Sequence, residues 1–292
     1  MSLLDPVRGL TLTRSAPGDR YFDYCLQPYT PRRPPNGKLR SENLLWACLE
    51  MAGMAKALRA PLTALQEALG RDMIVWGVKH DETRLWCELY VYDPQKEDPR
   101  ATVAGLTEIL APWFELRPSP RETIPYMMAS FDLDPQTIER GVIDEINLYL
   151  TGSNEHAGRS YLVREHELEM ANIYRFLEPK QHVDEVLSLI RSSATIDYTE
   201  PQTLSAVLIP ELFACKRVCV AKKRVFDGVY YSGIDVDQLL FFLKRCRYPQ
   251  RLQELVHGWA SDLDHLYFDV GLDVEQHEGA IRYPKTSFYG TL

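Results

Sequence analysis

The sequence predicts an α+β fold, in which an antiparallel β-barrel of about ten strands carries its helices on the outside. Five pairs of short segments with strand-like alternation occur along the chain, and stretches with helical periodicity lie before and between them. A parallel sheet would show single strands alternating with helices, so the paired segments favour antiparallel pairing. Such a sheet tends to close because closure removes its exposed edges. A closed barrel of this strand number has room for a ligand chamber.

The strand pairs are expected at residues 73–93, 127–150, 160–177, 215–234 and 266–289. Residues 1–40 form an irregular N-terminal segment, interpreted as a weak strand pair followed by a proline-rich connector. This connector would be a surface crossing or a flexible lid. No low-complexity linker divides the chain, so a single domain over residues 1–292 is predicted.

Helices are expected between these strand pairs, with boundaries set by capping residues and prolines. Ser41 and Asp235 are the expected N-caps, and Pro61 is expected to separate the first two helices. The helices are expected at residues 41–58, 61–70, 102–114, 183–191, 204–213, 237–246 and 249–259.

Composition excludes several classes of protein. A net charge of −8 and a pI near 5.5 argue against a nucleic-acid-binding protein, which usually carries a basic balance. The sequence has no apolar run long enough for a transmembrane helix, and its first ten residues do not resemble a signal peptide. The six cysteines form no CxxC pair. We expect them to be reduced and structural, in a cytoplasmic protein.

Alternation along the expected strands separates two kinds of face. In residues 84–92, one face carries Leu85, Cys87, Leu89 and Val91, which suits packing under helices. The same pattern gives three further aliphatic faces, Ala129–Phe131–Leu133, Ile146–Leu148–Leu150 and Leu266–Phe268–Val270–Leu272.

The opposite faces carry tyrosine, tryptophan and charged residues. They are Arg84–Trp86–Glu88–Tyr90–Tyr92, Ser130–Asp132–Asp134, Glu145–Asn147–Tyr149 and Tyr267–Asp269–Asp273. An open sheet would leave such a face in solvent, but its richness in aromatic residues favours the lining of a chamber. Basic and hydroxyl groups bind phosphate, and aromatic rings stabilise a carbocation. The chamber could therefore hold an organic diphosphate while it ionises.

Three segments resemble the ABBA-type prenyltransferases, with the closest likeness to the cyanobactin (ribosomal peptide) prenyltransferases. They are MMASFDLDP with IDEINLYL, VCVAKKRVFDGVYYSGIDVDQLLFFLK, and HLYFDVGLDVEQHEGAIRYPKTSFYG. The likeness extends over residues 73–290 in order and spacing. It implies repeated αββα units that close into a barrel around the reaction site.

The same resemblance implies the reaction and the partners. An isoprenyl group (dimethylallyl or geranyl) would pass from its diphosphate to a nucleophilic side chain of a ribosomal, cyanobactin-like peptide or an amino acid. Mg²⁺ would be bound mainly by the diphosphate, since the sequence has no DDxxD run and offers few protein ligands. The protein would be a monomer or a weak homodimer.

Site residues are carried over position by position from the resemblance. The residues expected to contact the diphosphate are Arg84, Asn147, Tyr149, Lys285 and, with an uncertain register, Arg217 or Lys222. Tyr174 and Tyr231 would shield the prenyl cation. Glu88 is the substitute for a catalytic carboxylate that the family places on the preceding strand, because MIVWGVK contains no acid. For each residue the alternative is a solvated charge or a contact at the barrel rim.

No other motif in the sequence indicates a different enzymatic activity. The sequence contains no hydrolase, dinucleotide or P-loop motif, and Asp132, Asp134 and Asp144 are interpreted as acids of a turn near Pro135. A non-catalytic barrel that binds or carries an aromatic or isoprenoid ligand is the alternative function. It would be favoured if Arg84 and Lys285 both pointed outward into solvent, because a carrier of neutral ligands needs no buried cations.

Overall fold

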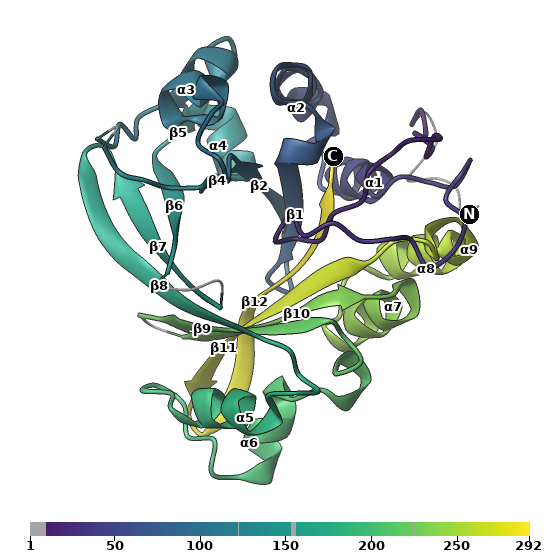
Figure 1. Ribbon diagram of the computed structural model, residues 1–292, viewed down its shortest axis with the longest axis vertical. Helices are drawn as coiled ribbons and strands as arrows, with labels where there is room; N and C mark the ends of the chain where they lie inside the picture. The colour runs from purple at the N-terminus through teal and green to yellow at the C-terminus, as the bar shows by residue number, and fades with distance from the viewer. Residues whose placement is uncertain (1–9, 122, 153–155, 225) are drawn as a thin grey trace.

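Ten antiparallel strands close into a barrel in the computed structural model, which describes residues 10–121, 123–152, 156–224 and 226–292 (Figure 1). Around the barrel the order is β1-β12-β11-β10-β9-β8-β7-β6-β4-β2, and β2 pairs with β1 to complete the ring. The predicted antiparallel barrel of about ten strands is confirmed. A separate pair, β3 and β5, is parallel and lies outside it.

The strands that form the barrel agree with the five expected pairs. They are β1 (Ile74–His80), β2 (Leu85–Tyr92), β4 (Met128–Leu133), β6 (Glu145–Thr151), β7 (Ala157–Arg164), β8 (Glu167–Leu177), β9 (Arg217–Lys223), β10 (Asp227–Ile234), β11 (Phe268–His277) and β12 (Ala280–Thr291). The parallel pair is β3 (Glu115–Leu116) and β5 (Val142–Ile143).

Helices surround most of the barrel. They are α1 (Glu42–Met51), α2 (Ala55–Leu69), α3 (Val103–Leu110), α4 (Pro135–Arg140), α5 (Val183–Arg191), α6 (Pro201–Val207), α7 (Val236–Arg245), α8 (Gln250–Gly258) and α9 (Ala260–Leu263), with 3₁₀ turns η2 (Arg71–Met73), η3 (Pro99–Ala101) and η4 (Pro210–Leu212). In Figure 1, α2, α3 and α4 lie at the top, α1 and α7–α9 at the right, and α5 and α6 at the bottom. The outer side of β8 instead leaves Leu168, Met170 and Ile173 exposed.

The helix expected at residues 204–213 is instead α6, which ends at Val207, followed by the 3₁₀ turn η4. Two further differences have identifiable reasons. The first two helices separate at Gly53, whose φ of +71° suits glycine, rather than at Pro61, which lies buried inside α2. The expected turn near Pro135 is the short helix α4, because the Asp134 side chain accepts a hydrogen bond from the Thr137 amide at 2.8 Å. By contrast, the expected N-cap Asp235 forms a complete capping box with Gln238.

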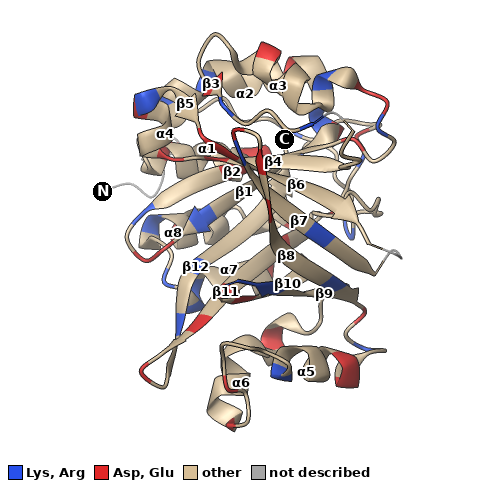
Figure 2. Cartoon of the chain, turned by 90° about the vertical axis from the view of Figure 1, so that its left-hand side faces the viewer, with Lys and Arg blue, Asp and Glu red and all other residues tan. Residues whose placement is uncertain are grey.

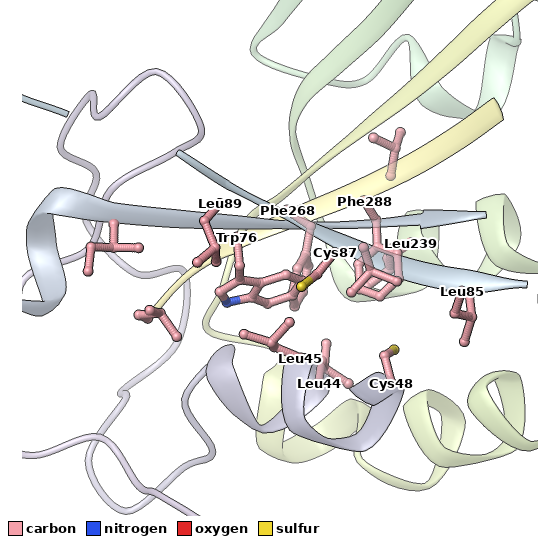
Figure 3. Close-up of a cluster of buried hydrophobic side chains, with 14 of the residues drawn as sticks. Leu44, Leu45, Cys48, Trp76, Leu85, Cys87, Leu89, Leu239, Phe268 and Phe288 are labelled. Atoms are coloured by element: carbon pink, nitrogen blue, oxygen red, sulfur yellow. The ribbon is translucent and has the colours of Figure 1, made fainter. Parts of the chain in front are cut away.

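The main hydrophobic core lies between the outer face of the barrel and the helices. Trp76, Phe268 and Phe288 are fully buried there, and Figure 3 shows them facing Leu44 and Leu45 of α1. All four predicted aliphatic faces point into this layer, and their residues are buried apart from the partly buried Leu150. The core thus fixes which side of every strand faces inward.

The N-terminal segment does not form the expected strand pair. In the described part of residues 1–40, only two isolated bridges occur, Arg14↔Leu39 and Phe22↔Pro28. In Figure 1 this purple segment reaches toward the middle of the barrel beside β1. No described helix combines the length and the apolar character needed to cross a membrane.

Candidate functional site

Six charged side chains line one level of the barrel interior, and we call them the charged layer. They are Lys79, Glu88, Asp132, Lys223, Asp273 and Lys285. Each lies on the strand face opposite to the hydrophobic core, as the alternation requires. Figure 2 shows charged positions along the strands as well as on the outer helices.

One half of the charged layer is built around a single lysine. The Lys79 ammonium lies 2.7 Å from Glu88 and 2.6 Å from Asp132. Glu88 also accepts hydrogen bonds from Ser130 Oγ, at 2.6 Å, and from the Tyr90 hydroxyl. Its carboxylate is therefore fully engaged, whereas the Asp132 side chain keeps 48% of its surface exposed.

The two carboxylates differ in acidity. Burial opposes ionisation of both, but the Lys79 and Lys285 charges lower the pKa of Glu88 below its ordinary value. For Asp132 the effect of burial, together with the nearby charge of Glu88, outweighs the lysines and raises its pKa. Asp132 is thus the member of the pair that takes up a proton more readily.

The other half of the charged layer has the reverse composition, two lysines around one acid. Asp273 lies 2.5 Å from the Lys223 ammonium and 3.0 Å from that of Lys285. Burial raises the pKa of Asp273, but the two ammonium groups outweigh it and hold the pKa well below its usual range. This half carries a net positive charge, and the Lys79 half a net negative one.

Lys223 is the more perturbed of these two cations. Burial and the charge of Lys285 lower its pKa to about 8, although Asp273 opposes the shift. Both ammonium groups share the single carboxylate of Asp273, so Lys223 also experiences the charge of Lys285.

Next to the charged layer lies a set of inward-facing aromatic rings that we call the tyrosine layer. It consists of Tyr90, Tyr149, Tyr174, Tyr230 and Tyr289. Neighbouring ring centroids lie 5.9 Å apart for Tyr90–Tyr289 and 6.0 Å apart for Tyr149–Tyr174. Burial raises the pKa of every one of these hydroxyls, so they remain neutral donors.

Glycines explain how two of these rings are oriented. A Cβ atom at Gly271 would lie 2.5 Å from the Tyr230 ring, and one at Gly77 would lie 2.7 Å from the Tyr289 ring. Real side chains do not approach so closely, so the missing Cβ atoms let both rings lie against the barrel wall. Both rings therefore lie along the inner surface of the barrel, whose interior we call the chamber.

Five of the sequence-predicted site residues line the chamber. Glu88 and Lys285 belong to the charged layer, and Tyr149 and Tyr174 belong to the tyrosine layer. Asn147 lies on the same inward face of β6 and is paired in register with Ser130. The roles assigned to these residues stay predictions.

The other predicted site residues lie elsewhere. Arg84 precedes β2 at the rim, where it is 45% exposed and pairs with Asp81 and Asp134. Arg217, the first residue of β9, lies near Asp23 of the N-terminal segment, at the end of the barrel away from the charged layer.

Two of the predictions are wrong about which face the residue occupies. Lys222 pairs with Asp227 at 3.0 Å on the outer side, and its neighbour Lys223 faces the chamber. Tyr231 donates a hydrogen bond to the Val207 carbonyl oxygen beneath α6, and its neighbour Tyr230 faces inward. In both cases two similar residues are adjacent, and a shift of one position exchanges the two faces.

Sequence reasoning also missed Lys79, Asp132 and Asp273 as members of one site. Strand alternation placed Asp132 and Asp273 on the polar faces, and it would have done the same for Lys79. The missing information was which strands become neighbours across the interior. Among the described residues, no group of three or more histidine, cysteine or acidic side chains is placed to hold a metal ion.

Of three comparisons with known proteins, the one with solved structures found similar chains. A scan against protein-family models and a search of the curated proteins each found no match. The solved structures include a similar chain, 5-dimethylallyl tryptophan synthase from Streptomyces coelicolor, in complex with DMASPP and Trp. The TM-score is 0.51 over 85% of this chain and 92% of that one. The two chains share the ABBA-type barrel fold. At 10% identity, the likeness shows the fold alone.

Proposed function

We propose that this protein is a prenyltransferase that moves a dimethylallyl or geranyl group from its diphosphate to a nucleophilic side chain. The observation that carries the proposal is the position of the Lys223–Lys285 pair beside the tyrosine layer in one chamber. A diphosphate needs cationic and hydroxyl donors, and an allylic cation needs aromatic faces. The chamber offers both within one contiguous wall. The fold shared with a synthase solved with DMASPP supports the same reaction.

In this proposal Lys223 and Lys285 bind the diphosphate as it leaves. The bond between the allylic carbon and the bridging oxygen breaks, and the diphosphate departs with the electron pair. Preorganised cations stabilise the charge that develops on it, which is the largest single contribution in many enzymes. The Tyr230 hydroxyl lies 3.0 Å from Lys223 and adds a neutral donor beside the pair.

The rings of Tyr149, Tyr174, Tyr230 and Tyr289 would shield the allylic cation from water. Their raised pKa values keep them from reacting as phenolate nucleophiles. Two of the rings lie against glycines, along the inner surface of the barrel. Attraction between a cation and an aromatic face is strongest where water is excluded.

A carboxylate in the Lys79 half would accept the proton that the nucleophile loses when its new bond to carbon forms. The sequence pointed to Glu88, but that carboxylate is buried and already bound to Lys79, Ser130 and Tyr90. Asp132 is also paired with Lys79, at 2.6 Å, but its side chain keeps 48% of its surface exposed, so it can accept a proton from a group that enters the barrel. We therefore propose Asp132 as the base and Glu88 as the residue that positions Lys79.

Mg²⁺ is proposed only as a counter-ion that arrives with the diphosphate. The diphosphate would supply most of its ligands, and the steps above name only what residues of this chain do. The acceptor is proposed to be a cyanobactin-like ribosomal peptide or an amino acid. The synthase of similar fold was solved with Trp, which supports an amino-acid side chain. A cytoplasmic location and a monomeric or weakly dimeric state are proposed on the sequence arguments.

A binding or carrier protein is the second candidate, and one observation favours it. The three lysines of the charged layer are paired with three carboxylates of the same layer. The condition stated for this alternative, that Arg84 and Lys285 both point outward, is not met, because Lys285 faces the chamber.

Incubation with Mg²⁺, dimethylallyl or geranyl diphosphate, and a panel of peptides and amino acids tests the proposal. Mass spectrometry should detect an added isoprenyl mass on an acceptor. Binding of either diphosphate without any transfer would support the carrier alternative. If calorimetry detected no diphosphate binding and no acceptor gained mass, the proposal would be wrong.

A further inference from the structure

The tip of the N-terminal segment is a tight loop at the end of the barrel away from the charged layer. The Asp23 amide donates to the Gln27 carbonyl oxygen at 3.1 Å, and the Tyr29 amide donates to that of Tyr21 at 2.9 Å. The Asp23 carboxylate accepts hydrogen bonds from the amides of Cys25 and Gln27, both at 2.9 Å. The loop therefore holds its own shape and presents Tyr24 at its tip.

One residue of this loop has an unusual backbone conformation. Leu26 has a φ of +54°, in the left-handed region that non-glycine residues rarely occupy. Strain of this kind persists only where surrounding contacts impose it, and it is concentrated at functional positions. The contacts in this case are made by the residue at the tip.

Tyr24 is bound by the barrel through its backbone as well as its ring. Its amide donates to Asp269 at 2.9 Å, and its carbonyl oxygen accepts a hydrogen bond from the Tyr92 hydroxyl. Its ring centroid lies 4.6 Å from that of Tyr289 and 5.2 Å from that of Tyr90. Two members of the tyrosine layer thus contact a ring that comes from the N-terminal segment.

These contacts have the form of a receptor for one residue of a polypeptide. A backbone N–H meets a carboxylate, a backbone C=O meets a hydroxyl, and the side chain enters an aromatic cage. Every residue except proline has the backbone N–H and C=O that Asp269 and Tyr92 bind, so these contacts do not depend on the side chain. The aromatic cage selects an aromatic side chain.

We propose that Tyr24 is an internal competitor, and that an aromatic residue of a polypeptide can take its place against Tyr90 and Tyr289, with its backbone bound by Asp269 and Tyr92. A peptide ligand must displace the Tyr24 loop, and the free energy of the loop contacts is subtracted from its affinity. This inference extends the proposed function to a class of ligand. It requires neither a diphosphate nor group transfer, so the two proposals can fail separately.

The test measures peptide binding by calorimetry with no diphosphate present. The probes are acetyl-Gly-Tyr-Gly-amide and the matched acetyl-Gly-Leu-Gly-amide, and the protein is the full chain. Tyr24→Ala should bind the tyrosine peptide at least tenfold more tightly than the wild type and should leave the leucine peptide unaffected. Phe22→Ala is the control, because that ring belongs to the same segment but lies beside Arg20.

A second variant, Asp23→Ala, keeps the proposal testable if Tyr24→Ala does not fold. Asp23→Ala removes the two hydrogen bonds that hold the loop tip and leaves Tyr90 and Tyr289 unchanged, so it should tighten tyrosine-peptide binding several-fold. It also removes a charge near Asp269, but an effect through Asp269 would reach the backbone of both peptides and would therefore appear with the leucine peptide as well. Hydrogen exchange on the wild type should show that the tyrosine peptide increases exchange at residues 23–27. Unchanged affinity in both variants, or slower exchange of these amides with peptide bound, would overturn the proposal.

Discussion

Tyr230 and Tyr231 are neighbours on β10, yet their side chains lie on opposite faces of the barrel. We call the face that packs under the helices the outer wall and the face that lines the interior the inner wall. The Tyr231 hydroxyl accepts a hydrogen bond from the Ile209 amide at 3.1 Å and lies among packed outer-layer residues. The Tyr230 hydroxyl lies 3.1 Å from Asp273 and its ring lines the chamber. The comparison shows that one strand contributes to the hydrophobic core on its outer side and to the proposed site on its inner side. Most predictions below follow from this division.

We expect a substitution in the outer wall to have the largest effect on stability. Trp76 is fully buried between the sheet and α1, so Trp76→Ala should lower the free energy of unfolding by about 3–5 kcal/mol. Denaturant unfolding followed by circular dichroism measures it. A loss below about 1 kcal/mol would mean that the outer wall does not support the barrel.

The inner wall should carry the largest effect on activity. Lys285→Ala should reduce prenyl transfer by roughly 100-fold or more, because removing a preorganised charge costs about 3–4 kcal/mol of barrier. A steady-state assay measures this loss, and the thermal midpoint should stay close to that of the parent. If the variant is stable and keeps more than half the parent activity, the role assigned to Lys285 is wrong.

The two tyrosines of β10 give a matched pair of intermediate size. Tyr231→Phe should destabilise the protein by about 1–3 kcal/mol, because it leaves the Ile209 amide and the Val207 carbonyl oxygen without their partner. Tyr230→Phe should cost less, since Lys223 and Asp273 still pair with each other. Equal costs in denaturant unfolding would contradict the division between the walls.

The smallest predicted effect is a pH dependence of diphosphate binding. Lys223 has a pKa of about 8, lowered by burial, so it is charged below that pH and loses its charge as the pH rises through it. Affinity for dimethylallyl thiolodiphosphate should therefore weaken by about tenfold from pH 7 to pH 9. Lys223→Arg should remove this dependence, because arginine stays charged. A wild-type affinity that does not change over this range would contradict it.

The sequence was sufficient for the barrel and for most of its two faces. Aliphatic alternation at Leu85–Val91 and Leu266–Leu272 identifies the outer wall, because only one side of a strand can face the helices. Where two similar residues are adjacent, as at Lys222–Lys223 and Tyr230–Tyr231, residue type alone does not show which of the two faces inward. Val218, Val220 and Val229 lie on the outer wall and would have fixed the register of both.

Other parts of the site could not be predicted from local patterns. Pairing between Lys79 and Asp132 depends on which strands become neighbours, and this is a property of the closed sheet. Tyr24 lies in an irregular loop without periodicity, so its sequence gives no indication that it enters the barrel.

The most direct test of the central claim compares Lys222 and Lys223, adjacent on β9 and on opposite walls. Calorimetric titration with dimethylallyl thiolodiphosphate at pH 7 should show that Lys223→Ala weakens binding by at least tenfold. Lys222→Ala should bind as the parent does. Equal affinities for the two variants, or a greater loss for Lys222→Ala, would contradict the assignment of the chamber as a diphosphate site.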